Sequence, residues 1–278
     1  MKFVATDKTL LVIDEKEKLP EDIKLTGWWY EGTGLQIGKF LRIVANNSQA
    51  SDMIAIQAQN QFRAPELAPS ICIKDIKRLY IMPAVVLDIA SSEQLVYVTK
   101  RLAARLPNVS QFSLVTNGVP QINKFALEIF DAITNSVTSL GLIRSPLGTT
   151  EGVQQALRRN PQIKQIGLGF HEHVLKWEQS VFKLIRNSPI EDIFLWFIPR
   201  GIIPRLQLMN EVQRIKTLKI LNISKSAVDE DLIDFLLETI DKLQFLEQLN
   251  MYNLINAQPE ALNRLRVFCR LKKIGFNF

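Results

Sequence analysis

The two histidines of the chain, His171 and His173, lie on either side of Glu172. On an extended strand, such alternating residues point to the same side, where two imidazoles could bind one metal ion. A zinc site needs a third and usually a fourth ligand, and neither Cys72 nor Cys269 is near in the sequence. We therefore predict a surface loop at this segment and no metal site.

The glycines Gly32, Gly34 and Gly38 are spaced as in a dinucleotide-binding loop. The surrounding sequence lacks the strand, helix and distal acid of a βαβ unit, and the bulky residues 28–30 would crowd a cofactor. Nucleophilic catalysis needs a base beside the nucleophile, and no serine or cysteine motif accompanies the histidines. The sequence thus predicts neither a cofactor nor an enzymatic activity.

Composition favours an ordered chain, because 47% of the residues are hydrophobic and Gly and Pro number only 12 each. The best apolar run, residues 193–198, is far shorter than the ~20 residues that span a bilayer. Asp7 interrupts the N-terminus before a signal-peptide core forms. The two cysteines indicate reduced thiols. We expect an intracellular protein, cytoplasmic or nuclear, that contacts no membrane.

An internal repeat organises most of the chain. Three apolar residues recur at positions 1, 4 and 6 of a short motif, and successive motifs begin 25 to 33 residues apart. The motifs are Ile76/Leu79/Ile81, Val109/Phe112/Leu114, Val137/Leu140/Leu142, Ile163/Ile166/Leu168, Ile190/Ile193/Leu195, Leu218/Leu221/Ile223, Leu246/Leu249/Met251 and Leu271/Ile274/Phe276. Positions 4 and 6 share one face of an extended strand, and position 1 enters the core from the preceding turn.

The segments between the motifs change to helical spacing, most clearly at residues 228–240, where Leu232, Leu236 and Ile240 share one face with Phe235. The same spacing predicts helices at residues 125–133, 152–157, 175–185 and 259–268. A short strand followed by a helix buries its apolar face only by stacking on neighbouring units. We therefore predict an α/β solenoid with a concave parallel sheet and convex helices.

This pattern resembles the leucine-rich repeat in its longer, ribonuclease-inhibitor-like form, over residues 71–278. The resemblance implies a horseshoe fold and a protein-recognition scaffold. The family signature adds an asparagine at position 9 that satisfies backbone groups of the turn, and only Asn117 matches it. The repeats are therefore divergent.

Residues 1–70 carry no clean repeat. Within them, residues 10–13, 25–30 and 53–56 are predicted strands and residues 35–44 a predicted helix. We interpret the region as an N-terminal cap that closes the exposed end of the solenoid core, or alternatively as a small appended α+β region.

Once positions 4 and 6 point into the core, positions 3, 5 and 7 face outward on the concave sheet. Aromatic residues there are typical interface anchors, and Phe194 and Trp196 are the strongest pair. A register slip of one residue would bury both of them, but it would also bury Asp192. The predicted partner-binding residues are Tyr80, Gln165, Phe194, Trp196, Asn222 and Tyr252.

The predicted function is that of an adaptor or complex subunit that binds a protein or peptide on the concave face. The alternative is a nucleic-acid-associated scaffold, because the formal charge is +6 and basic residues crowd the C-terminus. These are Arg264, Arg266, Arg270, Lys272 and Lys273. The identity of the partner and the oligomeric state stay open.

Overall fold

Strands and helices alternate along the chain in a computed structural model that describes residues 18–21, 23–32, 37–58, 72–83, 89–115, 136–143, 157–169, 185–186 and 188–278. The strands are β1 Trp28–Gly32, β2 Met53–Ala58, β3 Arg78–Pro83, β4 Gln111–Val115, β5 Ser139–Ile143, β6 Gln165–Gly169, β7 Asp192–Trp196, β8 Ile220–Ser224, β9 Gln248–Tyr252 and β10 Gly275–Asn277. The helices are α1 Ile37–Asn46, α2 Ile89–Ala103, α6 Ile202–Val212, α7 Glu230–Lys242 and α8 Pro259–Leu271, with a 3-10 helix η1 at Ser48–Ala50.

The strand order follows the chain order, from β1 to β10. The strand pairs β1–β2, β2–β3 and β3–β4, and those from β6 through β10, are all parallel. The chain divides into two compact units, Met1–Leu140 and Gly141–Phe278. This arrangement confirms an α/β fold with a parallel sheet, while the horseshoe and the leucine-rich-repeat assignment stay predictions.

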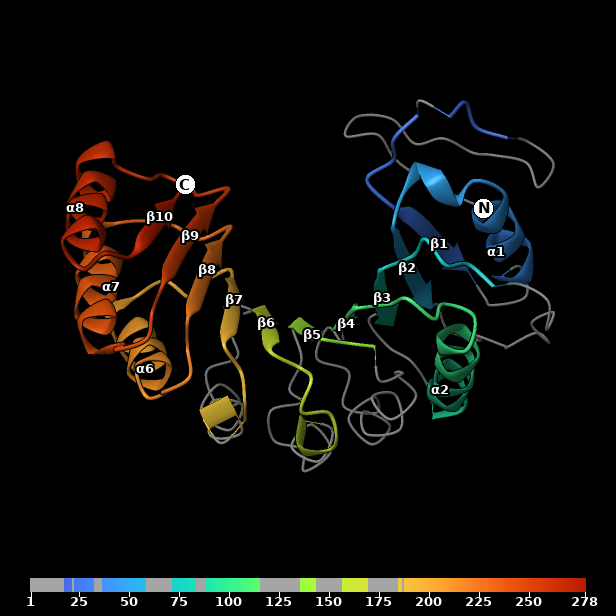
Figure 1. Cartoon of the computed structure of the whole chain (residues 1–278), viewed down its shortest axis with the longest axis horizontal. Helices are drawn as coiled ribbons and strands as arrows, with labels where there is room; N and C mark the ends of the chain where they lie inside the picture. Colours follow the sequence, from blue (N-terminus) through green and yellow to red (C-terminus); the bar gives the residue numbers. More distant parts are fainter. Residues whose placement is uncertain are drawn as a thin grey trace. The chain divides into compact units, whose positions relative to one another are not determined.

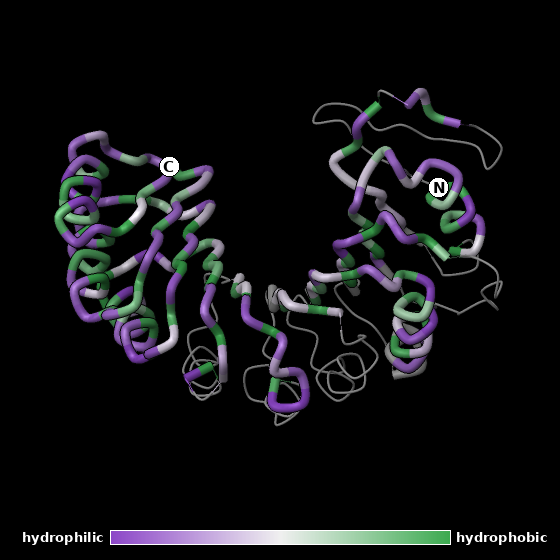
Figure 2. Tube along the Cα trace, in the orientation of Figure 1, coloured by the Kyte–Doolittle hydropathy of each residue, from purple (hydrophilic) through white to green (hydrophobic). Residues whose placement is uncertain are grey.

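Three helices of the second unit, α6, α7 and α8, lie side by side along one face of its strands (Figure 1). Hydrophobic and hydrophilic residues alternate along these strands and helices (Figure 2). In β7, Ile193 and Leu195 are fully buried, whereas Asp192, Phe194 and Trp196 stay partly exposed. The predicted register of β7 is therefore confirmed, and the one-residue slip is excluded.

Backbone hydrogen bonds join six of the repeats to the next one in the same way. The carbonyl of Glu191, at position 2, accepts the N–H groups of Lys219 at 2.8 Å and Ile220 at 3.0 Å. The Lys219 carbonyl in turn accepts those of Glu247 at 2.8 Å and Gln248 at 3.1 Å. The same double acceptance recurs at residues 52, 77, 110 and 164. Corresponding residues of neighbouring repeats are thereby aligned across the sheet.

The last predicted motif, Leu271/Ile274/Phe276, was wrong. Leu271 is 77% exposed, because α8 runs three residues beyond its predicted end and Leu271 is its final residue. Gly275 pairs with Gln248 and donates its N–H to the Glu247 carbonyl at 2.9 Å. The repeat therefore starts two residues later than predicted, which places Phe276 at position 4.

The N-terminal strands follow the same register as the predicted repeats. Trp28 pairs with Ile54, which pairs with Leu79. Leu25, Trp28 and Tyr30 are buried at the spacing of positions 1, 4 and 6. The boundary predicted at residue 70 is not settled by these pairings and stays a prediction. The predicted strand at residues 10–13 lies outside the described residues.

The predicted helices at residues 228–240 and 259–268 correspond to α7 and α8. The predicted helix at residues 125–133 lies outside the described part of the chain. Those at 152–157 and 175–185 are described only at Leu157 and Ile185, which are both helical and buried.

Helix α6 was missed because an arginine interrupts its apolar stripe. Its buried residues Arg205, Leu208, Met209 and Val212 have helical spacing. The Arg205 side chain is 1% exposed and donates to the carbonyls of Pro199 at 3.0 Å and Ala227 at 3.3 Å. It also pairs with Asp229, whose carboxylate caps α7. Arg205 thus joins the turns before two successive helices.

Replacing Arg205 with alanine is expected to lower the free energy of unfolding by about 3 kcal/mol, because buried carbonyls lose their donor and a cavity remains. Urea unfolding of the full chain measures this loss. Arg264→Ala is the matched control, since its ion pairs with Glu230 and Asp234 are exposed and exposed pairs contribute little. Equal effects of the two substitutions would contradict the structural role of Arg205.

Candidate functional site

The face of the second unit opposite α6–α8 carries repeat positions 3, 5 and 7, and we call it the open face. Its side chains fall into an aromatic group and a polar group. They are Gln165, Asp192, Phe194, Trp196, Asn222, Ser224, Gln248, Asn250, Tyr252 and Asn277. Strand alternation places them on this face because positions 4 and 6 occupy the core.

The aromatic group is a stack of three rings. The ring centroids of Phe194 and Trp196 lie 4.4 Å apart with 29° between the planes. Those of Phe194 and Tyr252 lie 6.3 Å apart at 15°. Trp196 extends over Gly167 of the neighbouring strand β6, where an added Cβ would lie 2.4 Å from its Cζ3 atom. Gly167 therefore leaves the space that the indole occupies.

Two rings of the stack lean over the strand between them. Phe194 is on β7 and Tyr252 on β9, with β8 in between. Two steps of the sheet span about 9.6 Å, yet the ring centroids are 6.3 Å apart. This explains why Asn222 and Ser224 of β8 are 5% and 3% exposed although they point away from the core. Asn222, a predicted partner-binding residue, lies beneath the rings, and its contact with a partner stays a prediction.

The polar group forms a ladder of side-chain hydrogen bonds across β6–β10. Asn277 Nδ2 donates to Asn250 Oδ1 and Asn250 Nδ2 to Asn222 Oδ1, each at 2.8 Å. Asn222 Nδ2 donates to Asp192 Oδ1 at 2.5 Å, and Gln165 Nε2 donates to Asp192 Oδ2 at 2.7 Å. The ionised carboxylate of Asp192 accepts hydrogen bonds and cannot donate them. The amides of the ladder therefore all point their N–H groups in the direction of Asp192.

Burial raises the pKa of Asp192 to about 6, and hydrogen bonds from Gln165 and Asn222 oppose this shift. The preceding residue, Glu191, has the opposite environment. Hydrogen bonds from Lys219 and Lys164 lower the pKa of Glu191, and the N–O distances are 2.8 Å and 3.4 Å. Glu191 therefore forms ion pairs with a lysine of each flanking repeat, whereas Asp192 accepts hydrogen bonds from neutral amides.

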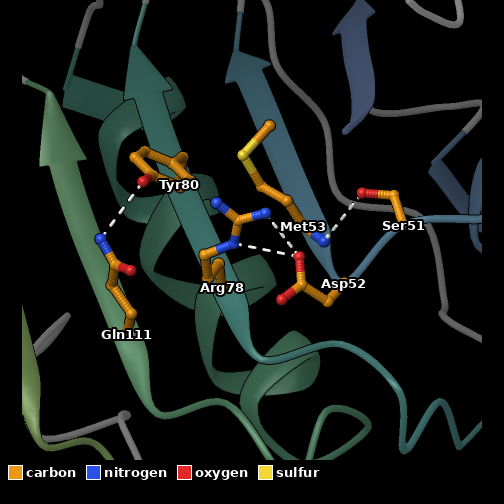
Figure 3. A network of polar contacts seen from close by, with 6 residues as sticks. All are labelled: Ser51, Asp52, Met53, Arg78, Tyr80 and Gln111. Atoms are coloured by element: carbon orange, nitrogen blue, oxygen red, sulfur yellow. Dashed lines mark hydrogen bonds and ion pairs between the residues drawn. The ribbon is translucent and has the colours of Figure 1, made fainter. Parts of the chain in front are cut away.

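Tyr80 belongs to the first unit, where its hydroxyl accepts a hydrogen bond from Gln111 Nε2 at 3.2 Å (Figure 3). Burial raises the pKa of the Tyr80 phenol. Beside it, Arg78 donates to Asp52 through Nε at 3.0 Å and Nη2 at 2.5 Å. The structure thus brings five of the six predicted residues together in the second unit and places Tyr80 in the other unit.

The sequence prediction did not select Asp192, Asn250 and Asn277 as site residues. Asn222, Asn250 and Asn277 occupy position 5 of three successive repeats. The shifted register of the last motif hid this alignment, because it placed Asn277 at position 7. Correct alignment of β10 would have shown from the sequence that three asparagines lie side by side at position 5.

The other candidate sites lie mostly outside the described residues, as His171, Glu172 and His173 do. Within the described ranges, no group of three or more His, Cys, Asp or Glu residues could hold a metal ion. Of the glycine pattern, Gly32 ends β1 and Gly38 lies in α1. No helix in the described part of the chain is long and apolar enough to cross a membrane.

The cysteines differ in exposure, since Cys72 is exposed and Cys269 is buried in α8. Burial raises the pKa of the Cys269 thiol to about 11. Its thiolate form is therefore scarce near neutral pH, which makes the thiol a poor nucleophile.

Acidic residues of α7 neutralise part of the C-terminal basic cluster. Arg264 pairs with Glu230 and Asp234, and Lys272 pairs with Asp241. These ion pairs lower the positive potential that a nucleic acid would meet.

Comparison with known proteins gives no assignment for the chain: no family model matches it, and neither does any curated protein.

The raised pKa of Asp192 predicts a pH dependence of stability. Folding raises this pKa from 3.8 to about 6, so the folded chain binds the proton more tightly than the unfolded chain. The resulting stability is fully present below about pH 4 and is lost as the pH rises through about 6. Asp192→Asn removes the titration. We expect the variant to gain stability relative to the wild type across this window.

Urea unfolding of both proteins from about pH 4 to pH 7 measures the difference between their unfolding free energies. Taking the difference cancels the carboxylates that both proteins share, including Glu191. A difference that stays constant across these pH values would contradict the assigned environment of Asp192.

Proposed function

We propose that the chain is a divergent leucine-rich-repeat protein that binds another protein through the open face of its second unit. The observation that carries the proposal is the stack of Trp196, Phe194 and Tyr252, which combines large aromatic surface with partial exposure. Tyr252 alone is 41% exposed. Aromatic residues at the centre of a face dominate many protein interfaces.

The turns after the strands support the family assignment. Phe197, Lys225 and Asn253 all occupy position 8, and each has a left-handed backbone, with φ between 49° and 57°. At position 9, the Ser226 hydroxyl accepts the Ile198 N–H at 3.0 Å and donates to the Ser224 carbonyl at 2.9 Å. A hydroxyl thus satisfies the backbone groups for which the family uses an asparagine.

The stack is held in place before any partner binds. Gly167 and Phe194 enclose the Trp196 ring, and the ladder packs beneath Phe194 and Tyr252. Side chains that are already ordered lose little conformational entropy on binding. Most of the apolar area that a partner covers therefore contributes to affinity, at about 25 cal/mol per Å².

Replacing Phe194 and Tyr252 together with alanine is expected to weaken partner binding about 100-fold, which corresponds to about 2.7 kcal/mol for two interface anchors. Trp196 is left in place, because its removal would open a gap above Gly167. The full chain serves as bait in cell extract, and the protein recovered is purified for calorimetry against each variant.

Phe245→Ala is the matched control, since Phe245 is 61% exposed and lies in the turn after α7, away from the open face. Its affinity for the partner should equal that of the wild type. Circular dichroism and the Tm check that the double variant folds. Unchanged affinity of a folded double variant would overturn the proposal.

A further inference from the structure

The carboxylate of Asp192 is half-buried on the open face. Its hydrogen bonds come from the amides of Gln165 and Asn222. Among the ion pairs of the described residues, none involves Asp192. Removing a charge from water is costly unless an opposite charge compensates for it. Within the described part of the chain, the open face therefore holds a negative charge that no ion pair compensates.

Two lysines of the neighbouring repeats do not supply this compensation. Lys164 and Lys219 lie at position 2 of the repeats on either side of β7, and both pair with Glu191. Successive residues of a strand point to opposite faces, so Glu191 and Asp192 are directed apart. The described residues thus neutralise Glu191 and leave Asp192 available to a cation from outside.

The hydrogen bonds of the ladder use only part of the acceptor capacity of the Asp192 carboxylate. Each carboxylate oxygen accepts one amide hydrogen, and a carboxylate offers about four acceptor positions. One acceptor position therefore remains on each oxygen, and such a pair of positions suits the two parallel N–H groups of a guanidinium. The single ammonium of a lysine would use this geometry less fully.

The aromatic rings continue from Asp192 along the same strand face. Phe194 and Trp196 follow at two and four residues, which places all three side chains on one side of β7. An arginine whose guanidinium reaches Asp192 lays its stem and its planar head against these rings. Arginine stacks on aromatic faces through cation–π contact, so the two interactions favour the same ligand.

We propose that Asp192, Phe194 and Trp196 form the subsite that receives an arginine side chain of the bound partner. The inference rests on the proposed function and names the partner's chemistry at that site. The partner presents a single arginine there, because the net charge of +6 disfavours approach of a strongly basic segment.

The test uses two small probes with the full chain, N-acetyl-arginine methylamide and its citrulline counterpart. Citrulline has the same length and a planar head, but it carries no charge. NMR follows the side-chain amide of Asn222 and the indole of Trp196. We expect the arginine probe to shift both signals with millimolar affinity and the citrulline probe to leave them unchanged.

The Asp192→Asn chain should lose the response to the arginine probe, while its amide keeps the ladder connected by reorientation of the Gln165 head. Asp234→Asn, in the exposed pair with Arg264, is the matched control and should respond as the wild type does. Equal responses to both probes, or none to either, would overturn the inference. So would an unchanged response in Asp192→Asn or a loss of response in the control.

Partner affinity separates this inference from the proposed function. If Phe194→Ala with Tyr252→Ala abolishes partner binding but Asp192→Asn leaves it unchanged, the arginine subsite is wrong and the binding face stands. If the double variant binds normally, the proposed function is wrong, whatever the probes show.

Discussion

In six repeats, one backbone carbonyl at position 2 accepts two N–H groups from the following repeat. The side chains at this position are of four types, in Asp52, Lys77, Ser110, Lys164, Glu191 and Lys219. The register therefore does not depend on which side chain occupies this position. Because neighbouring repeats cannot slide without breaking both bonds, the same repeat positions lie side by side across adjacent strands.

This alignment turns a pattern along the sequence into lateral contacts. Asparagines at position 5 of three repeats meet as a ladder, and a glycine at position 5 of β6 leaves space for Trp196. The amides of the ladder donate toward the carboxylate of Asp192, which forms no ion pair among the described residues. Among the described residues, the open face thus combines stacked aromatic side chains with one carboxylate outside any ion pair, and these features support the proposed binding of a partner.

The sequence predicted those parts of the fold that depend on alternation and spacing. The burial of Ile193 and Leu195 and the position of α7 follow directly from apolar periodicity. The last motif was predicted wrongly because Leu271, an exposed leucine at the end of a helix, has the spacing that a core residue would have. Arg205 hid α6, because a buried arginine satisfied by carbonyls and Asp229 is indistinguishable from a surface arginine in the sequence.

The sequence predicted which residues share the open face, but it did not predict how their side chains contact one another. Residue types and register placed Phe194, Trp196 and Tyr252 together. The burial of Asn222 depends on how far the neighbouring rings lean across β8, which no sequence pattern specifies. The role of Asp192 depends on Glu191 capturing both lysines, and this follows from side-chain geometry.

The alignment of repeat positions is tested most directly by nuclear Overhauser contacts of the Trp196 ring in the full chain. The account predicts cross-peaks between the outer ring protons of Trp196 and the α-protons of Gly167, since Trp196 pairs with Gly169 and lies over Gly167. Contacts of the Trp196 ring with the methyl groups of buried Ile166 or Leu168 instead would contradict it.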